Sequence, residues 1–256
     1  SSANNAVATL MYQVGMSVDM DYSPESSGAY VISAQSPVTN CAEYALKTYF
    51  GYKSTLKGVQ RSSYTQTQWM NLLKAELDAG RPVLYAGFGS GGGHCFVADG
   101  YDVNSYFHFN WGWNGSYDGY FLIGKLNPGS YYDFTNYQGA LYNIIAPNQT
   151  NNYHLVLYDN LNVHPQIVNC KEPFTMTTKI LNNGNRTFTG DLKASVLNAA
   201  SAVVAEIEMI QNISLSADND SSFSFQSEGV SGIAAGAYKI RLFYRNLNDT
   251  VWVSVT

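Results

Sequence analysis

One stretch of this chain, Gly91 to Phe121, constrains its fold more than any other part of the sequence. It reads GGGHCFVADGYDVNSYFHFNWGWNGSYDGYF. An apolar run that begins at Cys95 and a second run that ends at Phe109 flank turn residues between Asp99 and Ser105. Two such runs around a turn are typical of antiparallel strands. The sequence therefore predicts a β-hairpin, and glycines lead into its first strand.

The predicted hairpin brings a histidine close to an asparagine. With the turn near Val103, His94 lies opposite Asn110 or Trp111, and directly opposed residues have Cβ atoms roughly 5 Å apart. An amide oxygen beside one ring nitrogen fixes the imidazole tautomer, while the other nitrogen faces a nucleophile. This arrangement predicts the His–Asn half of a Cys-His-Asn protease site, with the Trp111 indole excluding water. The alternative is a structural histidine beside a turn asparagine.

Composition limits the class of protein. Charged residues make up 13% of the 256 residues and the net charge is −5, so no basic surface is expected for nucleic acid or an anionic membrane. No apolar run approaches the ~20 residues of a membrane span. Three cysteines do not make a disulfide framework. The chain shows no initiator Met and no signal peptide, and we expect it to be a processed chain or a fragment.

Apolar residues at helical spacing predict three helices in the first part of the chain. They are expected from Val7 to Val14 with an end at Gly15, from about Pro37 or Asn40 to Phe50, and from Thr65 to Ala79 with Gly80 as C′ residue. Ser36-Pro37 is the expected start of the second helix, with Asn40 and Glu43 as its capping box. Thr65 and Gln68 form the capping box of the third helix.

Strand patterns surround the hairpin and then fill the rest of the chain. Three strands are expected beside the hairpin, over Pro82–Phe88, Tyr117–Ile123 and Ala140–Ile145. Beyond a polar linker, Asn148 to Asn152, short alternating runs extend over His154–Tyr158, Phe174–Leu181, Gly190–Leu197, Val203–Met209, Ser221–Phe225 and Tyr238–Tyr244. Strands at this regular spacing favour an antiparallel β-sandwich, so the length is best explained by two domains.

The order of the histidine and the Asn-Trp-Gly sequence resembles the papain-like cysteine peptidases. In detail the chain resembles the streptopain-like peptidases, family C10, including their Bacteroidetes members. The matching segments of the hairpin region are GGHCFVADGYD, FHFNWGW, SYDGYF and LNP, and upstream ones are VGMSVDMDYSP, ALKTYFGY and RPVLYAG. The resemblance covers roughly residues 5 to 147. It implies a papain-like fold for this part of the chain.

The resemblance also assigns roles to residues of the hairpin. Carried over residue by residue, His94 is the general base, Asn110 orients it and Trp111 shields the pair. Gly93 is expected to offer its backbone to the substrate. His108 lies on the same face as Asn110 and is expected to be structural, because the matching motif has a non-catalytic histidine there. No metal site or cofactor is expected, because no metal-ligand spacing is found.

A polar loop from Pro24 to Pro37 precedes the second helix. The corresponding loop borders the cleft in streptopain-like enzymes, which implies that Ser27 and Gly28 contact the substrate backbone. The alternative is a solvated loop without a role.

The sequence does not identify a nucleophile for the His–Asn pair, which needs a cysteine thiol. Cys41 is either the first residue of a helix, where the dipole lowers a thiol pKa, or a buried structural cysteine on an apolar stripe. Cys95 neighbours His94 in a strand and therefore faces the opposite side of the sheet. Cys170 lies in the second domain, away from the hairpin. None of these positions predicts a reactive thiol beside His94.

The resembled family has its nucleophile at the start of a long helix that precedes the aligned region. No stretch of this chain matches the Gly-Cys-Val-Ala-Thr-Ala-like motif of that helix. The resemblance therefore implies that the catalytic cysteine belongs to an upstream segment or to a separate processed chain. We expect that polypeptide to be a partner of this chain.

These observations predict an α+β fold. Residues 1–147 are expected to form the C-terminal portion of a streptopain-type, papain-like domain, an incomplete antiparallel sheet with helices, and residues 151–256 an all-β immunoglobulin-like sandwich. The predicted function is that of a secreted bacterial cysteine endopeptidase that cleaves polypeptides through an acyl-enzyme. One alternative is a non-catalytic secreted protein whose sandwich binds glycan or protein. Another is a Cys-His amidase, which the Asn-Trp-Gly-Trp sequence disfavours.

Overall fold

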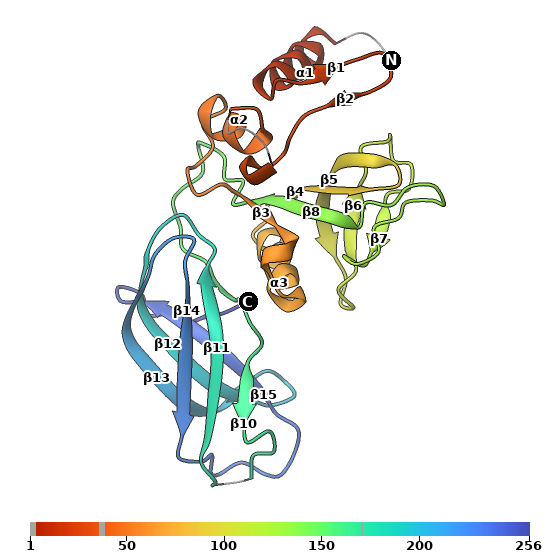
Figure 1. Ribbon diagram of the computed structural model, residues 1–256. Coiled ribbons are helices and arrows are strands. Elements are labelled where there is room, and N and C mark those ends of the chain that lie inside the picture. Colours follow the sequence, from red (N-terminus) through yellow and green to blue (C-terminus); the bar gives the residue numbers. More distant parts are fainter. Residues whose placement is uncertain (1–3, 36–38, 170) are drawn as a thin grey trace. The chain divides into compact units, whose positions relative to one another are not determined.

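The structure is a computed structural model of the chain, and it describes residues 4–35, 39–169 and 171–256. The expected helix start at Ser36-Pro37 and the residue Cys170 therefore lie outside the described residues. The chain forms two compact units, residues 1–149 and 150–256 (Figure 1). The described part of the first unit combines three α-helices with an antiparallel sheet, so the α+β prediction is confirmed there.

A six-stranded antiparallel sheet with the order β3-β8-β4-β5-β6-β7 is the centre of the first unit (Figure 1). Its strands are β3 (Lys57–Gln60), β4 (Val83–Gly89), β5 (Gly92–Tyr101), β6 (Phe107–Asn110), β7 (Gly119–Phe121) and β8 (Asn136–Tyr142). Strands β5 and β6 pair in antiparallel fashion, which confirms the predicted hairpin. Gly89 pairs with Gly92, so only Ser90 and Gly91 connect β4 to β5.

Helix α3 (Gln66–Asp78) packs against one face of this sheet. Its Trp69 indole Nε1 donates a 2.9 Å hydrogen bond to the buried Tyr85 hydroxyl on β4. The predicted capping box of Thr65 and Gln68 is confirmed, with both of its hydrogen bonds present. Gly80 follows the helix with a φ of 70°, a left-handed conformation that glycine adopts without a Cβ penalty.

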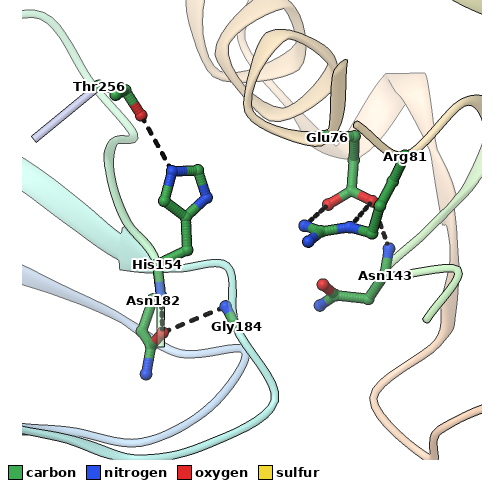
Figure 2. A network of polar contacts seen from close by, with 7 residues as sticks. All are labelled: Glu76, Arg81, Asn143, His154, Asn182, Gly184 and Thr256. Carbon is green, nitrogen blue, oxygen red and sulfur yellow. Dashed lines mark hydrogen bonds and ion pairs between the residues drawn. The ribbon is translucent and has the colours of Figure 1, made fainter. Parts of the chain in front are cut away.

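A buried ion pair ties the end of α3 to the sheet. Arg81 Nε and Nη2 donate to the Glu76 carboxylate at 2.9 and 2.7 Å, and the Asn143 backbone N–H donates to the same carboxylate at 2.9 Å (Figure 2). Glu76 is fully buried. Removing one member of such a pair would leave an uncompensated buried charge, which costs about 3–5 kcal/mol. The connection from α3 into β4 is therefore rigid.

The opposite face of the sheet carries a second apolar cluster under a short helix, α2 (Ala42–Thr48). The expected capping box of this helix is wrong. Cys41 is the N-cap, with extended backbone and no side-chain cap hydrogen bond, and Glu43 instead accepts from the backbone N–H and the hydroxyl of Ser33. The carboxylate is drawn to two donors of the preceding 3-10 turn, η1 (Ser33–Gln35), which leaves Asn40 outside the helix.

The first helix, α1 (Asn5–Ser17), continues beyond its predicted end at Gly15. Gly15 is a contact point instead of a terminus, because a Cβ there would lie 1.9 Å from the Tyr22 hydroxyl oxygen. Tyr22 belongs to a two-stranded ribbon of β1 (Asp21–Tyr22) and β2 (Ser27–Gly28). The glycine is thus required for close approach, while the apolar stripe from Val7 to Val14 is exposed.

The second unit consists of two four-stranded sheets in its described part. In the first sheet, β9 (Leu155–Leu157), β10 (Asn162–His164) and β14 (Asp220–Ser227) all pair with β11 (Phe174–Asn182). The second sheet has the order β13-β12-β15-β16. Its strands are β12 (Phe188–Leu197), β13 (Val203–Leu215), β15 (Lys239–Asn246) and β16 (Val253–Ser254). Buried Met176 and Phe225 of one sheet and Leu192 and Leu242 of the other share a single core. The two sheets therefore form a sandwich, and an immunoglobulin-like topology stays a prediction.

A buried asparagine organises the turn between β11 and β12. Asn182 Oδ1 accepts from the backbone N–H groups of His154 and Gly184 at 3.2 and 3.1 Å (Figure 2). Its Nδ2 donates to the carbonyls of Arg186 and Leu215, both at 2.9 Å. The side chain thus satisfies all four of its hydrogen-bonding positions, and it joins the first strand of this unit to the turn.

Candidate active site

His94 lies near the start of β5, and the structure corrects its expected relation to Asn110. Val97 is the residue that pairs with Asn110, because the register shifts between Ala98 and Gly100. Paired residues share a face of a sheet and neighbours along a strand alternate. His94 stands three residues before Val97, so its side chain is on the opposite face from Asn110. The predicted side-chain hydrogen bond between them is therefore wrong.

The carbonyl of Trp111 takes the place that the asparagine side chain was expected to fill. His94 Nε2 lies 2.7 Å from the Trp111 carbonyl oxygen. A carbonyl only accepts hydrogen bonds, so Nε2 carries the proton and the neutral ring has its lone pair on Nδ1. Among the described residues, this is the one side-chain hydrogen bond of His94. The structure therefore orients the imidazole so that Nδ1 faces away from the Trp111 carbonyl.

Asn110 still acts on this arrangement, through the backbone. Its Oδ1 accepts a 2.9 Å hydrogen bond from the Gly112 N–H, which belongs to the same peptide group as the Trp111 carbonyl. Gly112 has a φ of 75°, a conformation that a side chain would strain. The amide of Asn110 and the imidazole of His94 thus bind the two ends of one peptide group, and hydrogen bonds in such a series polarise one another.

Aromatic rings surround the half-buried His94 side chain. Trp113 stacks on the imidazole with 4.8 Å between ring centroids and 24° between planes, and Phe134 packs at 5.2 Å. The Trp111 indole is completely buried and lies 4.4 Å from the Phe96 ring. These rings restrict water around the Nε2 side of the imidazole, which strengthens its hydrogen bond. Sequence reasoning missed Trp113 and Phe134, although Trp113 is part of the FHFNWGW segment.

A loop between β7 and β8 brings Phe134 over the histidine. This loop crosses two glycines of β4 so closely that a Cβ on Gly87 would lie 2.0 Å from the Phe134 carbonyl oxygen, and one on Gly89 1.7 Å from that of Asp133. Buried Gln138 fixes the loop, because its Nε2 donates to the carbonyls of Ile123 and Thr135 at 2.8 and 2.7 Å. The glycines of β4 therefore serve to seat the loop beside the site.

The predicted substrate-binding residues lie in two different sheets. Gly93 precedes His94 on β5 and is exposed, and a Cβ there would lie 2.5 Å from the Phe88 ring. Ser27 and Gly28 form strand β2 of the separate ribbon and are exposed. The structure places Gly93 next to His94 and does not bring Ser27 and Gly28 into the same sheet.

Neither of the described cysteines is well placed to give its thiol proton to His94. Cys95 pairs with Ala86 on the face opposite to His94, and burial of its thiol raises the thiol pKa to about 12, although the residue as a whole is exposed. Cys41 is fully buried at the N-cap of α2. A thiol needs a lowered pKa and access to react. The expected structural role of Cys95 agrees with its orientation and its raised pKa.

His108 belongs to a different group on the opposite face. Its Nδ1 lies 2.5 Å from Asp99 Oδ1, and its ring meets Tyr120 edge-on at 5.1 Å. It shares this face with Asn110, as the alternation predicts. In the described ranges of the chain, no group of three His, Cys, Asp or Glu side chains could hold a metal ion. Nor does any described helix combine the length and apolar character needed to cross a membrane.

Comparison with known proteins finds a family that resembles this part of the chain. Residues 1–121 match the Peptidase C10 family, and this stretch contains both His94 and Trp111. The first part of the chain is similar to the peptidase C10 family. Streptopain of Streptococcus pyogenes is 39% identical to this chain over 145 residues, which are 54% of the chain and 34% of the relative. The chain thus spans about a third of the length of this curated C10 relative.

Two further proteins are similar to the same region. The thiol protease/hemagglutinin PrtT of Porphyromonas gingivalis is 40% identical over 125 residues, which are 49% of this chain and 14% of that protein. The structure of the active interpain A cysteine protease of Prevotella intermedia is 40% identical with a TM-score of 0.49, and covers 56% of this chain and 57% of its own. The names of these relatives describe cysteine peptidases.

Proposed function

We propose that this chain supplies the base half of a secreted bacterial cysteine endopeptidase that acts on polypeptides. The observation that carries the proposal is the 2.7 Å contact between His94 Nε2 and the Trp111 carbonyl. This contact fixes the tautomer that a Cys-His pair requires and leaves Nδ1 for a thiol. The match of residues 1–121 to the C10 family and the names of the relatives support the same reaction class.

In the proposed reaction, His94 moves protons while the backbone holds it. Nδ1 takes the proton of the thiol, and the thiolate adds to the scissile carbonyl carbon. The resulting imidazolium keeps its Nε2–H on the Trp111 carbonyl and gives the Nδ1 proton to the leaving amine. Water then adds to the acyl-enzyme while Nδ1 takes its proton. The C–S bond breaks, the carboxylic acid product leaves, and the imidazolium returns the proton to the thiolate. Trp113, stacked on the ring, keeps the imidazole from rotating between these steps.

The proposed thiol comes from a polypeptide other than the described residues. Cys95 faces away from His94 and has a raised thiol pKa, and Cys41 is fully buried. The partner is therefore an N-terminal segment or a separately processed chain that carries the catalytic cysteine. In the assembled site, the backbone of Gly93 borders the substrate next to His94. Ser27 and Gly28 contact the substrate only if the partner brings the ribbon of β1 and β2 next to His94.

Reconstitution tests this function. We expect no hydrolysis of casein by the chain alone, and hydrolysis after addition of the polypeptide encoded immediately upstream of Ser1. His94→Ala should then reduce kcat at least about 10³-fold, because the base is lost. His108→Ala is the matched control, a histidine of the same hairpin on the other face, and should retain activity. Asn110→Ala should be milder than His94→Ala, because the base remains.

A binding protein with a relic cleft is the second candidate, and the position of the two described thiols favours it. It predicts that the two polypeptides associate but hydrolyse nothing, and that His94→Ala and His108→Ala are indistinguishable. That result would reject the peptidase proposal. Secretion is tested separately, by assaying the chain in culture supernatant and in cell lysate.

A further inference from the structure

Asp118, at the end of the loop after β6, binds the backbone of Trp111, and the Trp111 carbonyl in turn binds His94. Asp118 Oδ1 accepts a 2.9 Å hydrogen bond from the Trp111 backbone N–H. We propose that Asp118 is a positioning residue, which fixes the Trp111 backbone and thereby the tautomer and orientation of the His94 imidazole. This inference rests on the proposed function, in which His94 is the base.

Trp111 is held at three points, and the loop that it begins supplies two of them. Its N–H donates to Asp118, and its indole Nε1 donates to the Tyr117 carbonyl at 3.0 Å. The third point is the following peptide group, whose Gly112 N–H donates to Asn110. Asp118 is the charged acceptor of this set, and hydrogen bonds to ionised acceptors are roughly twice as strong as neutral ones. Asp118 therefore supplies the strongest of the three hydrogen bonds that position the Trp111 backbone.

The backbone of the loop is strained in a way that serves these contacts. Asn114 and Tyr117 have φ values of 56° and 65°, a left-handed conformation that is unfavourable for a residue other than glycine. The bend at Tyr117 allows its carbonyl to accept from the Trp111 indole. Asp118 then leads directly into β7, where Gly119 pairs with Phe109. Asp118 is thus directly next to a residue that is paired in the sheet.

The consequence for His94 follows from its single side-chain hydrogen bond. Without the acceptor at Asp118, the Trp111 N–H loses its partner, and only the indole and the Gly112 N–H still position the Trp111 backbone. The acceptor at Nε2 of the neutral imidazole is then less well fixed, and the Nδ1–H tautomer becomes populated. That tautomer cannot accept a thiol proton at Nδ1. A variant without the acceptor should therefore fail at proton transfer while its binding surface stays intact.

The experiment reads the tautomer of His94 directly, by nitrogen-15 NMR of the full chain above the imidazole pKa, with His94→Ala for assignment. The expected wild-type spectrum shows a protonated Nε2 and an unprotonated Nδ1. Asp118→Ala and Asp118→Ser should each give a mixture of tautomers, and Asp118→Asn, which keeps an acceptor oxygen, should restore the single form. If Asp118→Ala does not fold, Asp118→Ser alone decides.

Asp133→Ala is the matched control. Asp133 Oδ1 likewise accepts a backbone N–H, that of Thr135, at 2.9 Å, in the loop whose Phe134 packs on His94. This variant should keep the single tautomer. A single Nε2–H tautomer in a folded Asp118→Ala or Asp118→Ser variant would overturn the proposal. So would a mixture in Asp118→Asn or an equal mixture in Asp133→Ala.

Kinetics give a second readout once the peptidase is reconstituted. Asp118→Ala should lower kcat about 100-fold with little change in KM, because misplacing the base by about 1 Å has an effect of that size. A change in KM alone would contradict a positioning role. The NMR result does not need activity, so a chain that proves to be no peptidase can still show whether Asp118 controls His94.

Discussion

At the residue scale, Tyr85 links the helix, the sheet and the loop that covers His94. Its buried hydroxyl accepts from the Trp69 indole at 2.9 Å and donates to the Gln138 side-chain carbonyl. Burial raises the pKa of Tyr85, so the hydroxyl remains protonated and able to donate. Gln138 in turn fixes the loop through the Ile123 and Thr135 carbonyls. The support of the site is therefore a continuous set of buried hydrogen bonds.

Tyr85→Phe should destabilise the first unit by about 2 kcal/mol, because it leaves a buried indole N–H and a buried amide oxygen without their partner. Urea unfolding followed by tryptophan fluorescence measures this, in a Trp252→Phe background that removes the signal of the second unit. Tyr101→Phe is the control, since the Tyr101 hydroxyl bonds to Asp78 at the surface. Equal losses in the two variants would contradict the account.

The sequence placed Trp111 near His94 but could not show that its backbone carbonyl binds the ring. Alternation along β5 and β6 predicted correctly that Cys95 faces away from His94. The register shift between Ala98 and Gly100 was not readable from the pattern, and one extra residue moves every later side chain to the other face. The acceptor then became a backbone carbonyl, which has no side-chain signature in any sequence.

At the element scale, Glu43 joins three segments of the first unit that are distant in the chain. Its Oε2 accepts from the Ser33 N–H and hydroxyl, and its Oε1 lies 3.2 Å from Lys47 Nζ. Burial acts to raise the carboxyl pKa, but hydrogen bonds from Ser33, from the Gly58 backbone and from Lys47 outweigh it, and the pKa is lowered. The 3-10 turn η1, helix α2 and strand β3 therefore depend on the ionised carboxylate.

This carboxylate should make the first unit sensitive to acid. Because the folded pKa lies below the unfolded one, the stabilisation is complete above the unfolded value of about 4.3 and is lost as the pH falls through the folded pKa. Glu43→Gln should therefore show a smaller drop in unfolding free energy than the wild type between pH 5 and acid pH. Glu25→Gln, which alters an exposed carboxylate, should follow the wild type; a wild-type slope in Glu43→Gln would refute the assignment.

Elements with strong local signals were predicted from the sequence, and short ones were not. The capping box of Thr65 and Gln68 fixed the start of α3, and most long strands of the second unit appear where alternation placed them. Strands β10 and β16, of three and two residues, are too short to show a period. The start of α2 was misjudged because Glu43 binds a distant turn, a tertiary contact that local capping rules cannot include.

At the scale of the whole molecule, the second unit contains its own core and closes on itself. The Leu157 N–H donates to the Thr256 carbonyl at 2.7 Å, so its first strand and its last residue are joined. We expect residues 151–256, expressed alone, to melt in one cooperative transition. Circular dichroism at 218 nm measures it. A gradual loss of signal would show that the unit needs residues outside this range.

The central proposal is that His94 is an oriented base and that neither of the described cysteines is the thiol it serves. The most direct measurement is the rate of iodoacetamide labelling of each cysteine in the isolated chain, read by peptide mass spectrometry. We predict slow labelling of Cys41, which is buried, and of Cys95, whose thiol pKa is raised to about 12, with rates unchanged by His94→Ala. Rapid, stoichiometric labelling of Cys41 that His94→Ala blocks would contradict the claim, and would make Cys41 the nucleophile.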